Sequence, residues 1–84
     1  NTSSFEIDLY PNPTNGKVFL SLDKVAGVIM IDLISSEGKS IWEEAYSTYD
    51  QTEFEFNLSD LAPGIYFFDI DANGENIYKK ILVE

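Results

Sequence analysis

The chain has 84 residues, enough for one domain with a single modest core, and its 44% hydrophobic content predicts a folded chain. Fifteen acidic residues against five lysines, with no arginine, give a net charge of −10, which disfavours nucleic acid and anionic membrane surfaces as partners. Because the sequence contains neither cysteine nor histidine, it offers no disulfide, no thiolate metal site and no base for a catalytic triad, so we expect no cofactor, no metal and no enzyme activity.

No apolar segment reaches the length of a membrane-spanning helix. Such a helix needs about 20 apolar residues, whereas the longest run here covers residues 28–31 and is stopped by Asp32. The sequence carries no signal peptide and starts at Asn1 instead of methionine. We therefore expect no direct membrane insertion. We also expect the chain to be a piece of a longer protein, in which residues 1–4 end a linker and residues 5–84 form the domain.

The first half of the chain predicts four strands separated by turns. Residues 5–9 alternate apolar and acidic side chains, which is the period-two pattern of a half-buried strand, and residues 17–22 also alternate. Residues 28–34 are almost continuously apolar, which is typical of a central strand covered on both faces. Ser35-Ser36-Glu37-Gly38 predicts a turn closed by a glycine at positive φ, which leads into a strand at residues 40–43.

The second half adds further strands and no long helix. Residues 45–51 fit either a loop or an edge strand, residues 52–58 alternate most cleanly, and residues 58–61 have the length of a single helical turn. Strands are expected at residues 65–71 and 77–83, joined by a two-residue turn at Asn73-Gly74. About seven short strands between turn signals predict an all-β fold, an Ig-like antiparallel β-sandwich.

Residues 9–16 form the most constrained stretch of the sequence. Pro11 and Pro13 fix two φ angles near −65° and remove two backbone donors, and each restricts the residue before it to extended conformations. Asn15 and Gly16 then supply a pair that readily accepts positive φ. We expect a rigid corner between two strands, and a crossing from one sheet to the other is an open alternative.

The last two strands allow a prediction of register. A two-residue turn at Asn73-Gly74 makes Ala72 face Glu75, Ile70 face Ile77 and Tyr66 face Ile81. One face of this hairpin should then belong to the core and also carry Lys79, whose ammonium must reach the rim. The other face is a candidate docking surface. The expected core residues are Tyr66, Phe68, Ile70, Ile77 and Ile81, and the expected docking surface is Ile65, Phe67, Tyr78 and Leu82 around Lys80.

Other candidate sites are weaker. The carboxylates of Glu6, Asp8, Glu53 and Glu55 fall on the outward phase of strands, where a solvated face is expected. Oxygen-bearing side chains at residues 69–75 faintly suggest calcium but lack the spacing of an EF-hand loop, so a plain hairpin turn is favoured. A tyrosine corner is expected at Tyr66, which follows Leu61 and Pro63. An aromatic platform for a sugar would use Trp42, Tyr46 and Tyr49.

Three segments in this order, Tyr10 to Gly16, Gly64 with Tyr66, and Lys79 to Val83, closely resemble the C-terminal sorting domain of the bacterial type IX secretion system. A central hairpin glycine followed by lysine completes the family pattern. The sequence departs from that pattern at Ser35-Ser36-Glu37, where the family often has an aspartate and an aromatic residue. The positions that carry the resemblance are Tyr10, Pro11, Asn12, Pro13, Asn15, Gly16, Gly38, Lys39, Gly64, Tyr66, Lys79, Lys80, Ile81, Leu82 and Val83.

The resemblance implies a secretion signal of Bacteroidetes-type bacteria. Such a domain directs a covalently linked N-terminal cargo from the periplasm through an outer-membrane translocon to the cell surface or the extracellular space. A sortase-like surface peptidase then removes the domain, and the cargo is anchored or released. Residues 1–4 are where the cleavage linker would lie. The alternative is an Ig-like carbohydrate-binding or adhesive module of a secreted protein, using Trp42 and the nearby tyrosines.

Overall fold

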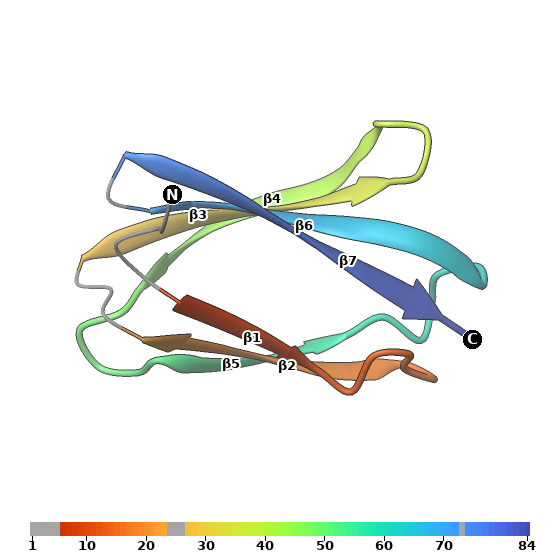
Figure 1. Ribbon diagram of the computed structural model, residues 1–84, viewed down its shortest axis with the longest axis horizontal. Helices are drawn as coiled ribbons and strands as arrows, with labels where there is room; N and C mark the ends of the chain where they lie inside the picture. Colours follow the sequence, from red (N-terminus) through yellow and green to blue (C-terminus); the bar gives the residue numbers. More distant parts are fainter. Residues whose placement is uncertain (1–5, 24–26, 73) are drawn as a thin grey trace.

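The computed structural model describes residues 6–23, 27–72 and 74–84, and within them the chain forms seven strands and no helix (Figure 1). No described segment therefore supplies an apolar helix long enough to cross a membrane. The predicted all-β fold and its strand number are confirmed. The strands are β1 (Glu6–Tyr10), β2 (Lys17–Asp23), β3 (Val28–Ser35), β4 (Ser40–Ser47), β5 (Glu53–Asn57), β6 (Gly64–Ala72) and β7 (Glu75–Val83).

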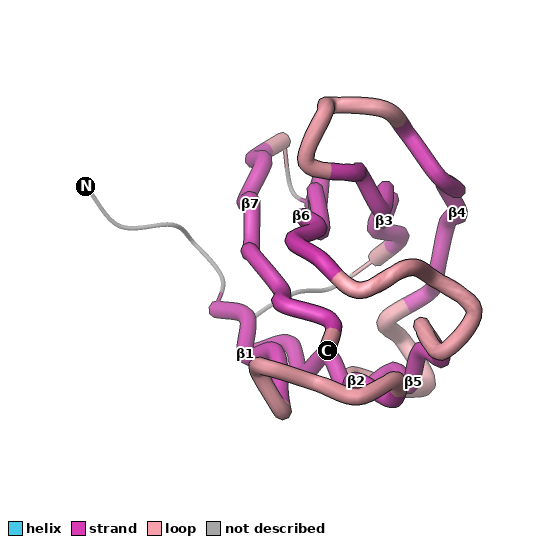
Figure 2. The backbone as a smooth tube through the Cα atoms, turned by 90° about the vertical axis from the view of Figure 1, so that its right-hand side faces the viewer, coloured by secondary structure: helices cyan, strands magenta, loops and turns pink. Residues whose placement is uncertain are grey.

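The strands form two antiparallel sheets packed face to face as a sandwich (Figure 2). The smaller sheet has the order β1-β2-β5, and the larger has the order β4-β3-β6-β7. β1 and β7 are therefore edge strands on the same side of the molecule, and β7 lies above β1 in the end view of Figure 2. This placement brings the first and the last strand of the domain to the same side of the sandwich.

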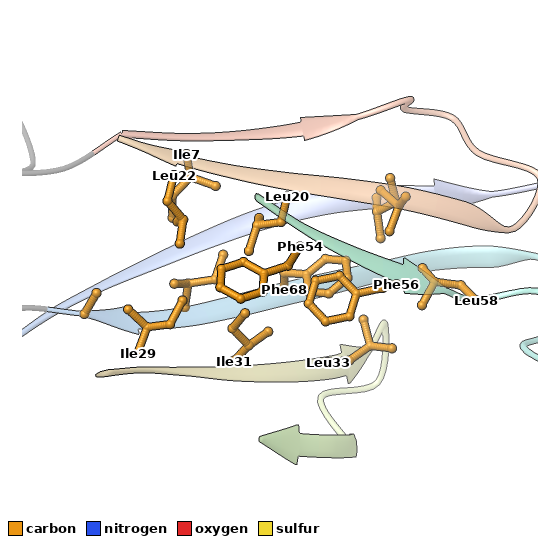
Figure 3. Packing of buried hydrophobic residues seen from close by; sticks show 14 of the residues in the cluster. Ile7, Leu20, Leu22, Ile29, Ile31, Leu33, Phe54, Phe56, Leu58 and Phe68 are labelled. Atoms are coloured by element: carbon orange, nitrogen blue, oxygen red, sulfur yellow. The ribbon is translucent and has the colours of Figure 1, made fainter. Parts of the chain in front are cut away.

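The core fills the space between the two sheets (Figure 3). Its residues follow the period-two alternation of the strands, because successive side chains of a strand point to opposite faces. In β2, for example, Val18, Leu20 and Leu22 are buried. Phe68 of β6 is fully buried and lies with its ring centroid 5.5 Å from that of Phe56 in β5, so aromatic contacts join the sheets.

The prediction that residues 28–34 are covered on both faces is wrong. Ile29, Ile31 and Leu33 point into the core, but Val28 is 67% exposed and Met30 is 39% exposed on the outer face. β3 is indeed central in its sheet. However, a two-layer sandwich covers only one face of each sheet, so the outward apolar residues of β3 remain on the surface.

The proline corner does not cross between sheets, because the strands on either side of it pair with each other: Tyr10 of β1 faces Phe19 of β2.

Residues 58–61 form a turn closed by the Leu61 N–H donating to the Leu58 carbonyl at 3.0 Å, not a helical turn. Residues 45–47 belong to the edge strand β4, and the following residues form a loop.

Both hairpin predictions agree with the structure. The Gly38 N–H donates to the Ser35 carbonyl at 2.9 Å, and Gly38 has a φ of +86°. In the last hairpin, Ala72 faces Glu75, and every expected cross-strand pair is observed. Asn73 itself lies outside the described residues, whereas Gly74 has a φ of +76°.

Candidate functional site

The proline corner is fastened to the free edge of β7. The Asn12 side chain donates from Nδ2 to the Lys80 carbonyl at 2.8 Å, and the Leu82 N–H donates to Asn12 Oδ1 at 3.1 Å. A carboxamide carries one donor side and one acceptor, as a backbone peptide does. Asn12 therefore occupies the place that a neighbouring strand would take along this edge of the sheet.

Thr14 extends the same attachment with its backbone. Its N–H donates to the Leu82 carbonyl at 2.9 Å, and the Glu84 N–H donates to the Thr14 carbonyl at 2.8 Å. The result is a short parallel bridge between Thr14 and Val83. We call the contacts of Asn12 and Thr14 with residues 80–84 the latch.

Thr14 also holds the corner in shape from within. It is only 1% exposed, and its hydroxyl donates to the Lys17 carbonyl at 2.6 Å and accepts from the Gly16 N–H at 3.1 Å. Sequence reasoning missed Thr14 as a site residue. The available signal was its position between Pro13 and the Asn15-Gly16 pair, where a hydroxyl commonly bonds the backbone of a turn.

The other corner residues make no hydrogen bond of the latch. The Tyr10 ring stacks on Phe19 at 5.8 Å, and its hydroxyl donates to Glu53, a hydrogen bond that raises the pKa of Tyr10. Pro11, Pro13 and Asn15 are exposed. Gly16 is buried, and its carbonyl accepts from the Leu58 N–H at 2.7 Å.

Gly64 and Tyr66 lie on the other side of β7. In the sheet, Gly64 faces Val83 and Tyr66 faces Ile81. The Tyr66 hydroxyl donates to the Ala62 carbonyl at 2.6 Å, which confirms the predicted tyrosine corner. β7 is therefore held by β6 along one edge and by the latch along part of the other.

The Gly38-Lys39 hairpin is at the same end of the sandwich but outside the latch. Ser35, which begins this turn, faces Tyr66 in the sheet. Figure 1 shows the proline corner, the β3–β4 hairpin, the start of β6 and the end of β7 all at its right-hand side. The structure thus gathers the predicted motif segments at one end, and direct hydrogen bonds join the corner to β7.

The outer face of β6 and β7 has the composition expected from the register. Ile81 and Val83 are buried, whereas Lys80 is exposed and Leu82 is 39% exposed. Lys79 falls on the inner face and is half-buried, as expected. The exposed apolar side chains of Ile65 and Tyr78 lie on the same outer face as Leu82.

Trp42 and Tyr46 do not form an exposed platform for a sugar. The Trp42 ring lies 5.5 Å from Phe56 and 6.3 Å from Phe68, and the Tyr46 ring lies 5.2 Å from Phe54. Burial, together with a hydrogen bond to Glu44, raises the pKa of Tyr46 to about 12. Both rings therefore cover the core between the edge strands β4 and β5, on the side of the sandwich away from β1 and β7.

The carboxylates at the start and middle of the chain form a solvated face, as expected. Glu6, Asp8, Glu53 and Glu55 are exposed on the smaller sheet, where Glu55 pairs with Lys17 at 3.3 Å. Within the part of the chain that the structure describes, no three potential metal ligands cluster. In the hairpin considered for calcium, the Asn76 side chain donates to the Asp69 carboxylate at 2.9 Å.

We expect the folded domain to be independent of calcium. Removing divalent ions with a chelator should leave the melting temperature unchanged within about a degree or two, because a ligand that binds only the folded state would raise it. Thermal unfolding with and without chelator checks this. A large drop after chelation would contradict it and restore the calcium hypothesis for residues 69–75.

The fold and the latch define a small all-β sandwich domain whose last strand is fastened by a corner near its beginning. Residues 8–84 match the sequence profile of the family described as the secretion system C-terminal sorting domain. Since the match covers nearly the whole chain, the chain belongs to this family of type IX secretion sorting domains. No significant match to a curated protein accompanies this result.

Membership defines the function at a coarse level. The domain is a sorting signal of type IX secretion, linked to an N-terminal cargo and handled by a secretion system. The protein that carries it is exported to the cell surface or the extracellular space. The family is not known for enzymes.

Proposed function

We propose that the secretion translocon recognises this domain as a folded unit, through the outer face of β6 and β7 next to the latch. The observation that carries the proposal is the apolar strip around Lys80, which consists of the exposed side chains of Ile65, Tyr78 and Leu82 and the half-buried Phe67. Exposed apolar side chains gathered on one face of a small domain commonly mark an interaction site. The lysine gives this strip a local positive charge in a chain of net charge −10.

The latch supports recognition of the folded state over recognition of a linear peptide. Asn12 and Lys80, which it joins, are 68 positions apart in the sequence. Only the folded domain holds β7 between β6 and the corner, with Lys80 and Leu82 turned outward. The corner, Gly64 and Tyr66 then act as positioning elements, and the lysine and apolar side chains of β7 as the contacts.

The later steps of sorting belong to the same proposal. After passage through the periplasm, a sortase-like surface peptidase cuts the linker at residues 1–4, and the cargo is anchored or released. These residues lie outside the described part of the chain. β1 begins at Glu6, at the end of the strand away from the corner, so a partner bound at the latch leaves the entry of the chain accessible (Figure 1).

The test is a pair of variants in a cargo reporter that is directed to the periplasm. Lys80→Glu with Leu82→Ser changes only the outer face of β7, and we expect surface-exposed reporter to be lost while the melting temperature of the purified domain is kept. Lys17→Glu on the opposite sheet changes the charge by the same amount and should be exported normally. Normal export of the double variant would refute recognition through this face.

A further inference from the structure

The free edge of β4 presents backbone groups that have no partner among the described residues. The residues of an antiparallel strand direct their backbone N–H and C=O groups alternately to its two sides. The Thr48 N–H donates to the Gly27 carbonyl at 2.8 Å, on the side where β3 begins. By alternation, Glu43, Ala45 and Ser47 direct their backbone groups away from β3, where β4 has no neighbouring strand.

The other three edge strands are shorter or partly closed. The latch occupies β7 from residue 80 to residue 84. The Gln51 side chain donates from Nε2 to the Glu53 carbonyl at 2.7 Å, which closes the start of β5. β1 and β5 have five residues each, whereas β4 has eight and lies on the flank opposite β7 (Figure 2). β4 is therefore the edge best suited to accept an added strand.

The side chains beside this edge are mainly acidic. Exposed carboxylates on the flank formed by β4, β5 and the loop between them belong to Glu43, Glu44, Asp50, Glu53 and Glu55. Lys17 of β2 pairs with Glu55 at 3.3 Å, and Lys39 precedes β4. Even with these two lysines, the described residues of this flank have a net negative charge. A basic extended segment is therefore attracted to it, and an acidic one is repelled.

The two adjacent glutamates of β4 point to opposite faces of the sheet, because successive side chains of a strand alternate. Glu44 shares the inner face with Trp42 and Tyr46, whereas Glu43 points outward. The Tyr46 hydroxyl donates to the Glu44 carboxylate at 3.0 Å, which holds the carboxylate beside the aromatic rings. A long basic side chain suits this place, since its apolar stem can pack on the rings while its charge meets the carboxylate.

Glu44 also determines which strands the edge rejects. An inward-pointing charge on an edge strand is a common protection against pairing with other chains. An apolar strand would cover the Glu44 carboxylate without offering it a partner, and an acidic strand would place a like charge opposite it. Only a strand with a basic residue at this position supplies the missing counter-charge. The edge is thus selective for one class of segment.

From these observations we infer that the free edge of β4 accepts an extended segment of a protein partner as a fifth strand of the larger sheet, with two consecutive basic residues opposite Glu43 and Glu44. One basic side chain then reaches Glu43 on the outer face, and the next reaches Glu44 on the inner face. Backbone hydrogen bonds to Glu43, Ala45 and Ser47 supply the affinity, and the basic pair supplies the specificity. This surface goes beyond the proposed recognition through β6 and β7 and does not depend on it.

The test uses capped eight-residue peptides in which threonine and valine alternate around a central pair of residues. The pair is Lys-Lys in the probe and Glu-Glu in the control, and a third peptide keeps Lys-Lys but is N-methylated at its backbone amides. At saturating concentration, the probe should slow hydrogen exchange of the Glu43, Ala45 and Ser47 amides of the 84-residue chain by roughly tenfold. The acidic and the N-methylated peptides should leave these amides unchanged.

A pair of matched variants separates this site from general attraction to an acidic chain. Glu43→Gln with Glu44→Gln should weaken binding of the probe roughly tenfold, which corresponds to ~1.4 kcal/mol. Glu53→Gln with Glu55→Gln removes the same charge from β5 and should leave binding within about twofold. Equal weakening in both variants, or equal binding of the N-methylated peptide, overturns the inference. Exchange at the three amides that slows with rising chain concentration, without peptide, would assign the edge to a second copy and overturn its assignment to a partner.

Discussion

Gly16→Ala should destabilise the domain by about 2–4 kcal/mol, clearly more than Gly64→Ala at about 1–2 kcal/mol. Both glycines have a φ of +152°, a backbone conformation that residues with a side chain rarely adopt. They differ in their surroundings. A Cβ at Gly16 would lie 3.2 Å from the Ser59 Cβ, whereas a Cβ at Gly64 would have no atom within 4 Å.

The crowding at Gly16 has no easy relief. The carbonyl of Gly16 accepts from the Leu58 N–H at 2.7 Å, so the corner and the turn after β5 cannot separate without losing this bond. Urea unfolding of both variants measures the two costs, and Gly64→Ala is the control for backbone strain alone. Equal losses of stability in the two variants would contradict the extra cost that we assign to crowding between a Cβ at Gly16 and Ser59.

The features that local chemistry determines were predictable from the sequence. The alternation in β2 and β5 identified the buried residues, since a strand has only two faces and one of them must be apolar. The register of β6 and β7 followed from the length of the turn alone, because a two-residue loop fixes every pair that comes after it. The tyrosine corner followed from the spacing of Tyr66 after Pro63.

The latch was not predictable in the same way. The sequence shows that the corner is rigid, but it does not show which distant edge the corner meets. Asparagine is an ordinary turn residue, so nothing in the sequence distinguishes Asn12. Only the packing of the two sheets lets its carboxamide form hydrogen bonds with the backbone of Lys80 and Leu82. Similarly, the apolar run in β3 could not reveal whether a second layer covers its outer face, because a buried strand and a strand with an exposed apolar surface have the same composition.

The latch also bears on how an edge strand is kept from pairing with other chains. An open edge presents unpaired N–H and C=O groups that another strand can join. Asn12 and Thr14 occupy these groups at residues 80, 82 and 84, so the end of β7 cannot add a strand while the corner is in place. The outer face of β7, rather than its edge, is then the surface that this strand offers to a partner near the latch.

Thr14→Val should loosen the latch while keeping the shape of the side chain. Thr14 is 1% exposed, and its hydroxyl satisfies both the Lys17 carbonyl and the Gly16 N–H. Valine removes both hydrogen bonds and leaves these backbone groups without their partner, which should cost about 2–4 kcal/mol in total. In a domain of this size, that loss lowers the melting temperature by roughly 10–25 °C.

Hydrogen exchange distinguishes a loosened latch from a general loss of stability. The Leu82 and Glu84 amides donate to Asn12 and Thr14, so in Thr14→Val they should exchange faster by a larger factor than the amide of Phe68 in the core. Thr14→Ser keeps the hydroxyl and should preserve protection at both latch amides despite the missing methyl group. If Leu82, Glu84 and Phe68 lose protection by the same factor in Thr14→Val, the corner and β7 unfold only with the whole domain. In that case the latch has no local opening of its own.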